Sequence, residues 1–480
     1  MSFPHLGIEL KQTPPSYAKR NDLAGNTTSI RLPRCAETAL ETIESAGFEA
    51  WVVGGFVRDC LMGRDPGDLD IASSAPWERA ASIFRKAGTP VFETGAKHGT
   101  ITVMIEEAPI EVTAYRADGE YTDGRHPDSV RFVDSIEEDL ARRDFTMNAI
   151  AYHPARGLID PFGGQNDIRN GLIRCVGDPR KRFSEDALRI LRAVRFSSQL
   201  GFAIEKGTRS AMEDLAGGLS RVAEERKAAE LQKLLCSEHA GDCLMGNMTV
   251  IGQVIPELAP LQGFDQKTPF HCYDVLEHTA HVIDLVDCKP ALRWAALLHD
   301  VGKPETFTID ETGQGHFKGH PAASARIARD VARRLRLPKA QTRDMLTLIE
   351  LHDSPIIPKK PQVKHAIHQL GDSPGLLSDL ISLKHADATA RTPLYSKPRV
   401  RTAELLEGLL AEVLENGEAY SLAQLDLSGA SLIDAGIPAG PQVGRLLEEC
   451  LDAVIDGKLP NEEGELAGFA LSRYREDARA

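Results

Sequence analysis

The 480-residue chain has few cysteines and no long apolar run. Its 8 cysteines are scattered from Cys35 to Cys450, and none forms a Cys-x-x-Cys pair. That pattern argues against a zinc ribbon or a disulfide framework and suits a reducing cytosol. No stretch is apolar over the length that crosses a bilayer, and the first residues lack the basic and apolar regions of a secretory signal. We therefore expect a cytoplasmic protein with no membrane partner.

An excess of basic charge is lacking too, because 56 Lys and Arg oppose 70 Asp and Glu, for a net charge of −14. Taken alone, this balance argues mildly against nucleic acid as a partner. Residues 180–195 depart from it, with a basic stretch made of Arg180, Lys181, Arg182, Arg189, Arg192 and Arg195. If the chain binds RNA, we expect Lys181, Arg182 and Arg195 to contact it; a solvated basic face is the alternative.

The hydropathy pattern divides the chain into a mixed first part and a helical remainder. Short apolar runs at residues 51–53, 101–105 and 110–115 predict strands, and a helical pattern covers residues 36–43. After about residue 175, nearly every apolar pattern has the helical period. The predicted segments are a loose extension (1–32), an α+β domain (33–160) and three helical parts (161–250, 251–395 and 396–480).

Two aspartates near the first predicted strand indicate a metal site. Asp68 and Asp70 are two residues apart, a spacing that puts both carboxylates on one face of a strand. Paired carboxylates repel each other unless cations lie between them, so this is a natural site for two Mg²⁺ ions, with Glu111 of a neighbouring strand as the third ligand. Gly54 and Gly55 lie just upstream and permit close backbone approach to a phosphate. The alternative is a solvated turn, because Asp-x-Asp alone is a common pattern.

The segment from Gly54 to Asp59, followed by Asp68-Leu69-Asp70, resembles the head of the DNA polymerase β-type nucleotidyltransferases. Specifically, it is similar to the class II CCA-adding enzymes and the bacterial poly(A) polymerases. The likeness continues, in the family's order, through residues 139–149, 160–164 and 185–189. It implies an α+β polymerase-β-like head followed by an all-α neck, body and tail. The implied reaction adds CCA to the 3′ end of tRNA from CTP and ATP, with two Mg²⁺ ions.

The resemblance also implies roles for single residues. Gly54, Gly55 and Arg58 match positions that hold the triphosphate. Arg143 and Asp144 match positions that hold the sugar and the shape of the site, and Arg192 is assigned to nucleotide binding with them.

Asp186 and Arg189 match the residues that select the base in this family. Their i, i+3 spacing predicts one shared face of a helix. A carboxylate accepts from the exocyclic amino group of cytosine or adenine, and a guanidinium donates to the neighbouring ring nitrogen or carbonyl. Guanine and uracil mismatch both groups. The alternative is an ordinary surface salt bridge between Glu185 and Arg189.

The sequence favours CCA addition over poly(A) synthesis. Residues 94–103 resemble the CCA-adding version of this strand, and residues 118–127 resemble the flexible loop of full CCA enzymes. His126 stands in that loop where many relatives have Arg. A poly(A) polymerase, or an enzyme that adds only the final A, stays an alternative.

The helical middle carries a second set of potential metal ligands. Residues 297–304 match the H-D-x-G-K pattern of HD domains, and His278, His299, Asp300 and Asp387 are ordered like an HD metal site. His352 belongs to the same ordered series, and His320 is a further candidate. Such sites hydrolyse phosphoesters with a divalent metal. The second rival function is accordingly an HD phosphohydrolase whose head only senses nucleotides.

Overall fold

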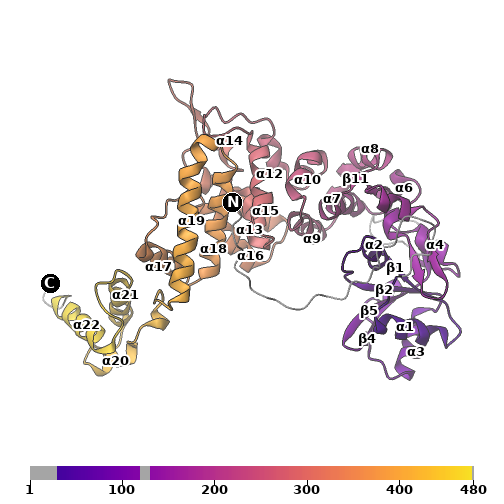
Figure 1. The fold of residues 1–480 in the computed structure, drawn as a ribbon, viewed down its shortest axis with the longest axis horizontal. Coiled ribbons are helices and arrows are strands. Elements are labelled where there is room, and N and C mark those ends of the chain that lie inside the picture. Colours follow the sequence, from indigo (N-terminus) through magenta and orange to yellow (C-terminus); the bar gives the residue numbers. More distant parts are fainter. Residues whose placement is uncertain (1–29, 119–129, 478–480) are drawn as a thin grey trace, which may run out of the picture. The chain divides into compact units, whose positions relative to one another are not determined.

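The computed structural model describes residues 30–118 and 130–477 and divides into two compact units. Unit 1 extends to Lys227 and unit 2 begins at Ala228, and each is considered by itself (Figure 1). Within the described residues, no helix has the length and apolar character needed to cross a membrane.

Unit 1 is built on a seven-stranded sheet in the order β3-β4-β5-β2-β1-β8-β9. Its strands are β1 (Ala50–Val53), β2 (Leu69–Ser73), β3 (Val91–Phe92), β4 (Thr100–Ile105), β5 (Ala108–Ala114), β8 (Ala151–His153) and β9 (Gly157–Ile159). Only β2 and β5 pair in parallel; the other neighbours are antiparallel. A separate pair joins β6 (Arg116–Asp118) to β7 (Val130–Phe132). The strands predicted from apolar runs are confirmed, and the α+β class with them.

Helices cover both faces of this sheet. They are α1 (Arg34–Glu44), α2 (Gly55–Leu61), α3 (Trp77–Lys86), α4 (Ile136–Ala141) and α5 (Gly164–Arg169). The α1 and α3 helices pack on one face, and α4 packs on the other (Figure 1). Alternation along β4 and β5 sends every second side chain into the core, where Ile101, Val103, Ile110 and Val112 are buried.

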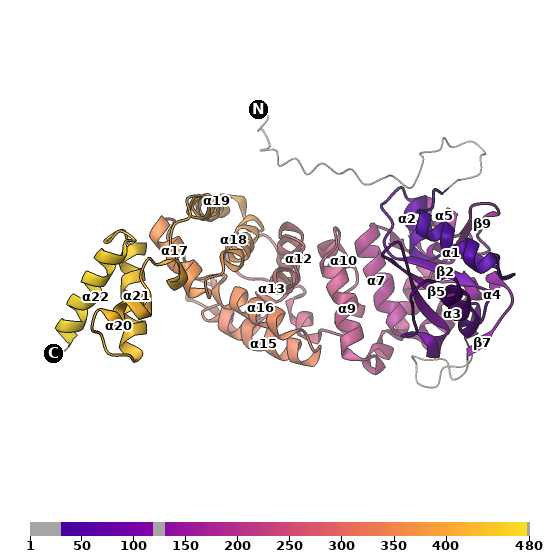
Figure 2. The same cartoon turned by 90° about the horizontal axis from the view of Figure 1, so that it is seen from below.

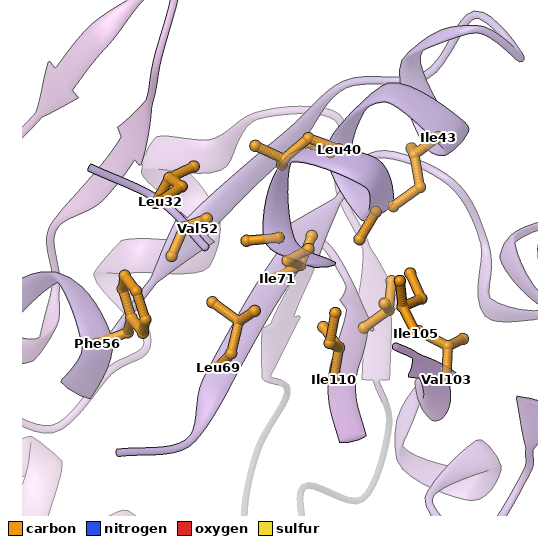
Figure 3. Close-up of a cluster of buried hydrophobic side chains, with 14 of the residues drawn as sticks. Leu32, Leu40, Ile43, Val52, Phe56, Leu69, Ile71, Val103, Ile105 and Ile110 are labelled. Carbon is orange, nitrogen blue, oxygen red and sulfur yellow. The ribbon is translucent and has the colours of Figure 1, made fainter. Parts of the chain in front are cut away.

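The apolar face of α1 packs against the sheet and forms part of the core. Leu40 and Ile43 of α1 meet Val52 and Ile71 of the strands (Figure 3). Burying each such side chain contributes about 1.5–3 kcal/mol, so this packing fixes the strand register. Leu32 lies in the same cluster, so the head begins earlier than residue 33, the predicted boundary.

The rest of unit 1 is helical, as the change of period near residue 175 predicted. Its elements are β10 (Leu172–Ile173), α6 (Pro179–Glu185), α7 (Leu188–Leu200), β11 (Ala203–Ile204) and α8 (Lys206–Leu215), followed by the start of α9 (Glu224–Leu235). Asp178 caps α6 by accepting from the Arg180 amide, and Gly201 ends α7 in the left-handed conformation.

Unit 2 is almost entirely helical. Its helices are α10 (Ala240–Gly246), α11 (Met248–Ile251), α12 (Val275–Leu285), α13 (Pro290–Leu298), α14 (Lys303–Thr306), α15 (His320–Arg334), α16 (Lys339–Leu351), α17 (Lys360–Gln369), α18 (Pro374–Thr389), α19 (Pro393–Glu415), α20 (Gly429–Asp434), α21 (Pro441–Ile455) and α22 (Glu463–Asp477). The bundle of α12, α13, α15, α16 and α18 packs side by side (Figure 2). The last three helices enclose a small cluster of their own around Leu432, Leu446 and Leu466. The all-helical prediction for this part is confirmed, apart from the short pair β12 (Thr308–Ile309) and β13 (Gly315–His316).

Candidate active site and metal centre

The carboxylates of the head meet where β1, β2 and β5 lie side by side. Asp70 on β2 is the register partner of Glu111 on β5 and of Val53 on β1. Glu111 is exposed while its neighbours on β5 are buried, as the alternation predicted. Asp68 differs from the prediction, because it precedes the first residue of β2. The physical reason is that Pro66 and Gly67 lead into the strand, and sheet pairing with β1 begins only at Asp70.

The electrostatics of this cluster suit a divalent cation. Burial raises the pKa of the Asp70 carboxyl to about 6; Arg143 opposes the rise, while Glu111 and Asp68 add to it. Asp68 and Glu111 are therefore close enough to repel the Asp70 charge. A hard cation such as Mg²⁺ bound beside Asp70 would offset this repulsion and favour the ionised carboxylate.

Gly54 leaves the space beside these carboxylates open. It follows β1 with a φ of 78°, a conformation that favours glycine. A Cβ at this position would lie 3.2 Å from Arg143 Nη1 and 3.6 Å from Asp70 Oδ2. A side chain here would fill the place where a negative group can approach the Arg143 guanidinium. A Cβ on Gly55 would lie 3.6 Å from Arg58 Nη2.

Two arginines beside the glycine turn are held by buried acidic or amide partners. Arg58 donates from Nε to Asp59 at 2.8 Å and from Nη1 to Asn148 at 2.8 Å, so much of its guanidinium is bound inside the head. Arg143 donates to Asp139 at 3.1 Å. Asp139 is fully buried and was not among the predicted site residues, although it opens the 139–149 motif.

The buried Asp144 carboxylate links the head to α7. Its Oδ2 accepts from Arg192 Nε at 2.8 Å, and its Oδ1 accepts from the Asn148 amide at 3.2 Å. Burial alone would raise the pKa of Asp144; Arg192 and Asn148 outweigh it and lower the pKa to about 2. In this structure Arg192 therefore holds α7 to the head.

Asp186 and Arg189 do not share one helix, which corrects the prediction. The chain leaves α6 at Glu185, Asp186 has extended backbone angles, and α7 begins at Leu188. Between the two helices, the Asp186 carboxylate accepts from the Leu188 amide at 2.9 Å, a turn that immediately precedes α7. Its other oxygen accepts from Arg226 on α9 at 2.8 Å, a partner that no local pattern indicated.

Arg189 makes the salt bridge with Glu185 at 2.6 Å, but the pair is largely buried rather than on the surface. Its Nη2 also donates to the Arg142 carbonyl at 3.1 Å. Arg142 is covalently next to Arg143, whose guanidinium lies beside Gly54 and Asp70. The candidate base-selecting residues are thus joined to the carboxylate cluster through two consecutive arginines.

The predicted RNA-binding residues do not form one exposed group. Lys181 is exposed, whereas Arg182 donates to the Val176 carbonyl and pairs with Glu185 at 2.7 Å. Arg195 is buried, with its guanidinium carbon 4.0 Å from the centre of the Phe196 ring. Its apolar surroundings in α7 explain why charge in the sequence did not predict exposure. The loop at 119–129, with His126, lies outside the described residues.

In unit 2, the HD ligands converge between helices. One possible metal-binding group is His278, His299, Asp300 and Asp387, as predicted; a second is Asp300, His320 and His352. All these side chains are buried. Asp300 belongs to both groups, so the centre contains six residues: the four predicted ligands together with His352 and the further candidate His320.

The four histidines are oriented in the same way. The Nδ1 atom of each lies within hydrogen-bond distance of a backbone carbonyl, at 3.2 Å for His278, 2.8 Å for His299, 2.9 Å for His320 and 2.7 Å for His352. A carbonyl only accepts, so each Nδ1 carries a proton and each Nε2 is turned toward the carboxylates of the centre. His299 Nε2 is buried with no hydrogen-bond partner among the described residues. This orientation is the one that metal-ligating histidines adopt.

The ligand atoms of the second group, Asp300, His320 and His352, are arranged so that a cation can bind between them. His320 Nε2 and His352 Nε2 are 3.1 Å apart, and both ring nitrogens are lone-pair acceptors when their Nδ1 atoms are protonated. The Asp300 Oδ1 atom lies 3.4 Å from the first and 3.9 Å from the second. Three facing acceptors are stabilised only by a shared proton or a metal ion, so the residues fit a divalent metal.

Cations around the centre keep both aspartates ionised. Burial opposes ionisation of Asp300, but His299 and Lys303 hold its pKa well below the usual range. Burial likewise opposes ionisation of Asp387, where Arg391 and His278 have the larger combined effect and lower the pKa. Lys303 Nζ lies 2.7 Å from Asp300, and Arg391 Nη2 lies 2.6 Å from Asp387. An ionised carboxylate is the form of aspartate that binds a metal ion.

Three family models match the chain in the order of these sites. The Poly A polymerase head domain matches residues 50–174, and the Probable RNA and SrmB- binding site of polymerase A matches residues 201–261. The HD domain matches residues 271–392. The fold and the two sites therefore define a nucleotidyltransferase with an HD domain.

Comparison with individual proteins identifies the family within this class of nucleotidyltransferases. The chain is 33% identical over 436 residues to the CCA-adding enzyme of Leuconostoc mesenteroides, covering 91% of this chain and 95% of that protein. It is 35% identical over 433 residues to the CCA-adding enzyme of Geobacillus thermodenitrificans, covering 89% and 94%. The crystal structure of the Bacillus stearothermophilus CCA-adding enzyme in complex with CTP matches with a TM-score of 0.66 and 30% identity, over 93% of this chain and 98% of that one. The chain belongs to the family of CCA-adding enzymes.

Proposed function

We propose that this chain adds or repairs the 3′-terminal CCA of tRNA, using CTP and ATP, in the cytoplasm. The observation that carries the proposal is the register of Asp70 with Glu111 beside the open turn at Gly54. Family membership supports the choice of reaction, and the relative crystallised with CTP supports CTP as one substrate. The alternative of poly(A) synthesis is not favoured, because the matched relatives are CCA-adding enzymes.

In this proposal, Asp68, Asp70 and Glu111 hold two Mg²⁺ ions where β2 begins, between β1 and β5 in the middle of the sheet. When bound, such ions neutralise charge on the triphosphate and favour ionisation of the RNA 3′-hydroxyl. The space left by Gly54 brings the triphosphate to the Arg143 guanidinium, which Asp139 fixes in place. Gly55 and Arg58 are proposed to lie along the same triphosphate.

Base choice is assigned to Asp186 and Arg189. Asp186 keeps acceptor capacity for an exocyclic amino group even while it binds Arg226 and the Leu188 amide, because a carboxylate offers about four lone-pair sites. Arg189 is held against the Arg142 carbonyl, and Asp144 with Arg192 fixes the helix that carries it. Lys181 is the predicted RNA contact that the structure leaves exposed, with Arg182 and Arg195 assigned to supporting positions.

The direct test is incubation of a tRNA lacking CCA with each labelled nucleotide, followed by sizing of the product. Growth by three nucleotides with CTP and ATP is expected; a long A tail would replace the proposal with poly(A) synthesis. The Asp70→Ala variant is expected to abolish addition while tRNA binding, measured by filter retention, stays near that of the unchanged enzyme. Near-normal incorporation by this variant would refute the assignment of the metal site.

A second candidate function is metal-dependent hydrolysis of a phosphoester in the HD domain, in addition to CCA addition. The observation that favours it is the common orientation of the four histidines toward two ionised aspartates. Its test is hydrolysis of nucleoside phosphates by the enzyme supplied with Mn²⁺, Ni²⁺ or Mg²⁺. Activity that persists in His299→Ala would contradict the assignment, whereas loss of activity with unchanged CCA addition supports it.

A further inference from the structure

A pocket of about 450 Å³ opens onto the HD metal centre. His320 of the second metal group lines it, together with Lys303 and Arg391, which contact Asp300 and Asp387. Pockets of this size hold ligands as large as a nucleotide. A molecule bound in this pocket is therefore placed beside the proposed metals.

The charge of the pocket favours an anion. Its charged lining consists of Lys303, Lys318, Arg391, Arg399 and the single carboxylate of Asp353. Arg399 pairs with Asp353 at 3.3 Å, and Lys318 is exposed. A phosphate group fits this excess of cations, which the aspartates of the metal centre only partly balance.

An exposed aromatic pair stands at the edge of the same pocket. Phe270 lines the pocket and packs edge-to-face on Tyr395, with ring centroids 4.9 Å apart. Phe270 is 40% exposed and Tyr395 is 41% exposed. The Phe270 carbonyl accepts from the Thr392 amide at 3.0 Å, which fixes the pair at the start of α19. Large aromatic rings left exposed beside a cationic pocket resemble the stacking surfaces on which proteins place nucleic-acid bases.

A polar atom between the aromatic pair and the metals also lacks a partner. His271 Nδ1 is buried and makes no hydrogen bond within the part of the chain that the structure describes. The His271 ring lies against His278 with centroids 5.3 Å apart, and His271 lines the pocket. A buried unsatisfied nitrogen is costly, and a polar group of a ligand such as a ribose hydroxyl would satisfy it.

We propose that Phe270 and Tyr395 make the HD site selective for nucleoside phosphates by stacking the base, with His271 bonding the ribose and the cations binding the phosphate. This inference rests on the proposed hydrolase activity of the HD domain. The reaction is hydrolysis: a water oxygen forms a bond to phosphorus, the bond between phosphorus and the ribose oxygen breaks, and that oxygen leaves with a proton. Water is the only co-reactant.

The test compares two substrates that carry the phosphate on the same ribose oxygen but differ in the base, adenosine 3′-monophosphate and ribose 3-phosphate. Stacking of one base is worth about 5- to 150-fold in affinity. The full-length enzyme should hydrolyse the nucleotide with a higher kcat/KM by about this factor. Phe270→Leu should raise KM for the nucleotide by a similar factor, with kcat and the ribose phosphate reaction unchanged. Phe270→Trp should restore the nucleotide KM.

Leu394→Ala is the matched control, because Leu394 is 76% exposed beside Tyr395 but belongs to neither the pair nor the pocket. An equal kcat/KM for both substrates, or a Phe270→Leu variant that changes both alike, would overturn the stacking surface while leaving the hydrolase intact. If the unaltered enzyme hydrolyses neither substrate with any of the metals, the proposed hydrolase activity is wrong. The stacking surface is still supported if calorimetry shows that the nucleotide binds more tightly than the ribose phosphate and that Phe270→Leu removes this difference. A short RNA ending in a 3′-phosphate, run beside the mononucleotide, distinguishes an RNA end from a free nucleotide as the source of this ligand.

Discussion

Replacement of Asp186 by Asn tests the proposed choice of base with little change in shape. The Asn side chain keeps an oxygen that can accept from the Leu188 amide, so the start of α7 is retained. What changes is the edge offered to the nucleotide, because one carboxylate oxygen becomes an NH₂ donor. That donor replaces the oxygen bound by Arg226; toward the nucleotide, it is a mismatch for the amino group of cytosine or adenine and a match for the carbonyl of uracil.

The expected magnitude follows from the kind of hydrogen bond exchanged. A bond to a charged carboxylate is worth about 1.5–3 kcal/mol, so kcat/KM for CTP and ATP should fall about 10- to 150-fold. A new neutral bond to uracil is worth about 0.5–1.5 kcal/mol, so kcat/KM for UTP should rise about 2- to 10-fold. The ratio of CTP to UTP incorporation should therefore fall by a factor on the order of 100.

The assay is single-nucleotide incorporation into a tRNA lacking CCA, with CTP and UTP measured separately. Arg226→Gln is the control, because it removes the ion-pair partner of Asp186 at 2.8 Å but leaves the carboxylate and its hydrogen bond from the Leu188 amide. This control should keep the preference for CTP over UTP. A CTP to UTP ratio that is unchanged in Asp186→Asn, in a variant that folds and binds tRNA, would show that Asp186 does not read the base.

Two further expectations concern the buried pair in the head and the metals of unit 2. Arg192→Gln leaves the buried Asp144 charge without its ion-pair partner; since Arg192 is one-third exposed, a loss of about 2–3 kcal/mol in the free energy of unfolding is expected by urea titration. The pKa of Asp144 is depressed from 3.8 to about 2 in the folded protein. Ionised Asp144 therefore contributes about 2.5 kcal/mol to the free energy of unfolding above pH 4, and this contribution is lost as the pH falls from about 4 to about 2. Stability curves between pH 2 and 5 that run parallel for Arg192→Gln and the unaltered enzyme would contradict this origin. Elemental analysis should show that Asp300→Asn loses the metals of both groups and that His352→Ala loses the metal of one group. Full metal content in Asp300→Asn would show that Asp300 is not a ligand shared by the two groups.

The sequence predicted the elements whose signal is local. β1 was visible as a short continuous apolar run, and β4 and β5 because strand side chains alternate between two faces. The same alternation put Glu111 on the open face. The H-D-x-G-K pattern indicated the metal centre because His299 and Asp300 are adjacent in the chain. Such features depend on covalent spacing, which a sequence states directly.

Other features depended on side chains that come from distant segments. The spacing of Asp186 and Arg189 predicted one helix, but Asp186 lies between α6 and α7 and is bound by Arg226, forty residues away. Arg195 has the charge of an RNA contact, yet it lies in the buried side of α7. Neither outcome has a local signal, because burial and ion pairing depend on what packs against a helix.

By itself, the sequence determined the order of the motifs, the strand faces that carry carboxylates, and the class of reaction those residues suit. The tertiary structure decided which groups meet: Asp70 with Glu111 across a parallel strand pair, Arg189 with the Arg142 carbonyl, and one aspartate, Asp300, shared by two sets of histidines. The physical reason is that side-chain periodicity is set by neighbours along the chain, whereas a binding site requires segments far apart in sequence to be held a few ångströms from one another by core packing.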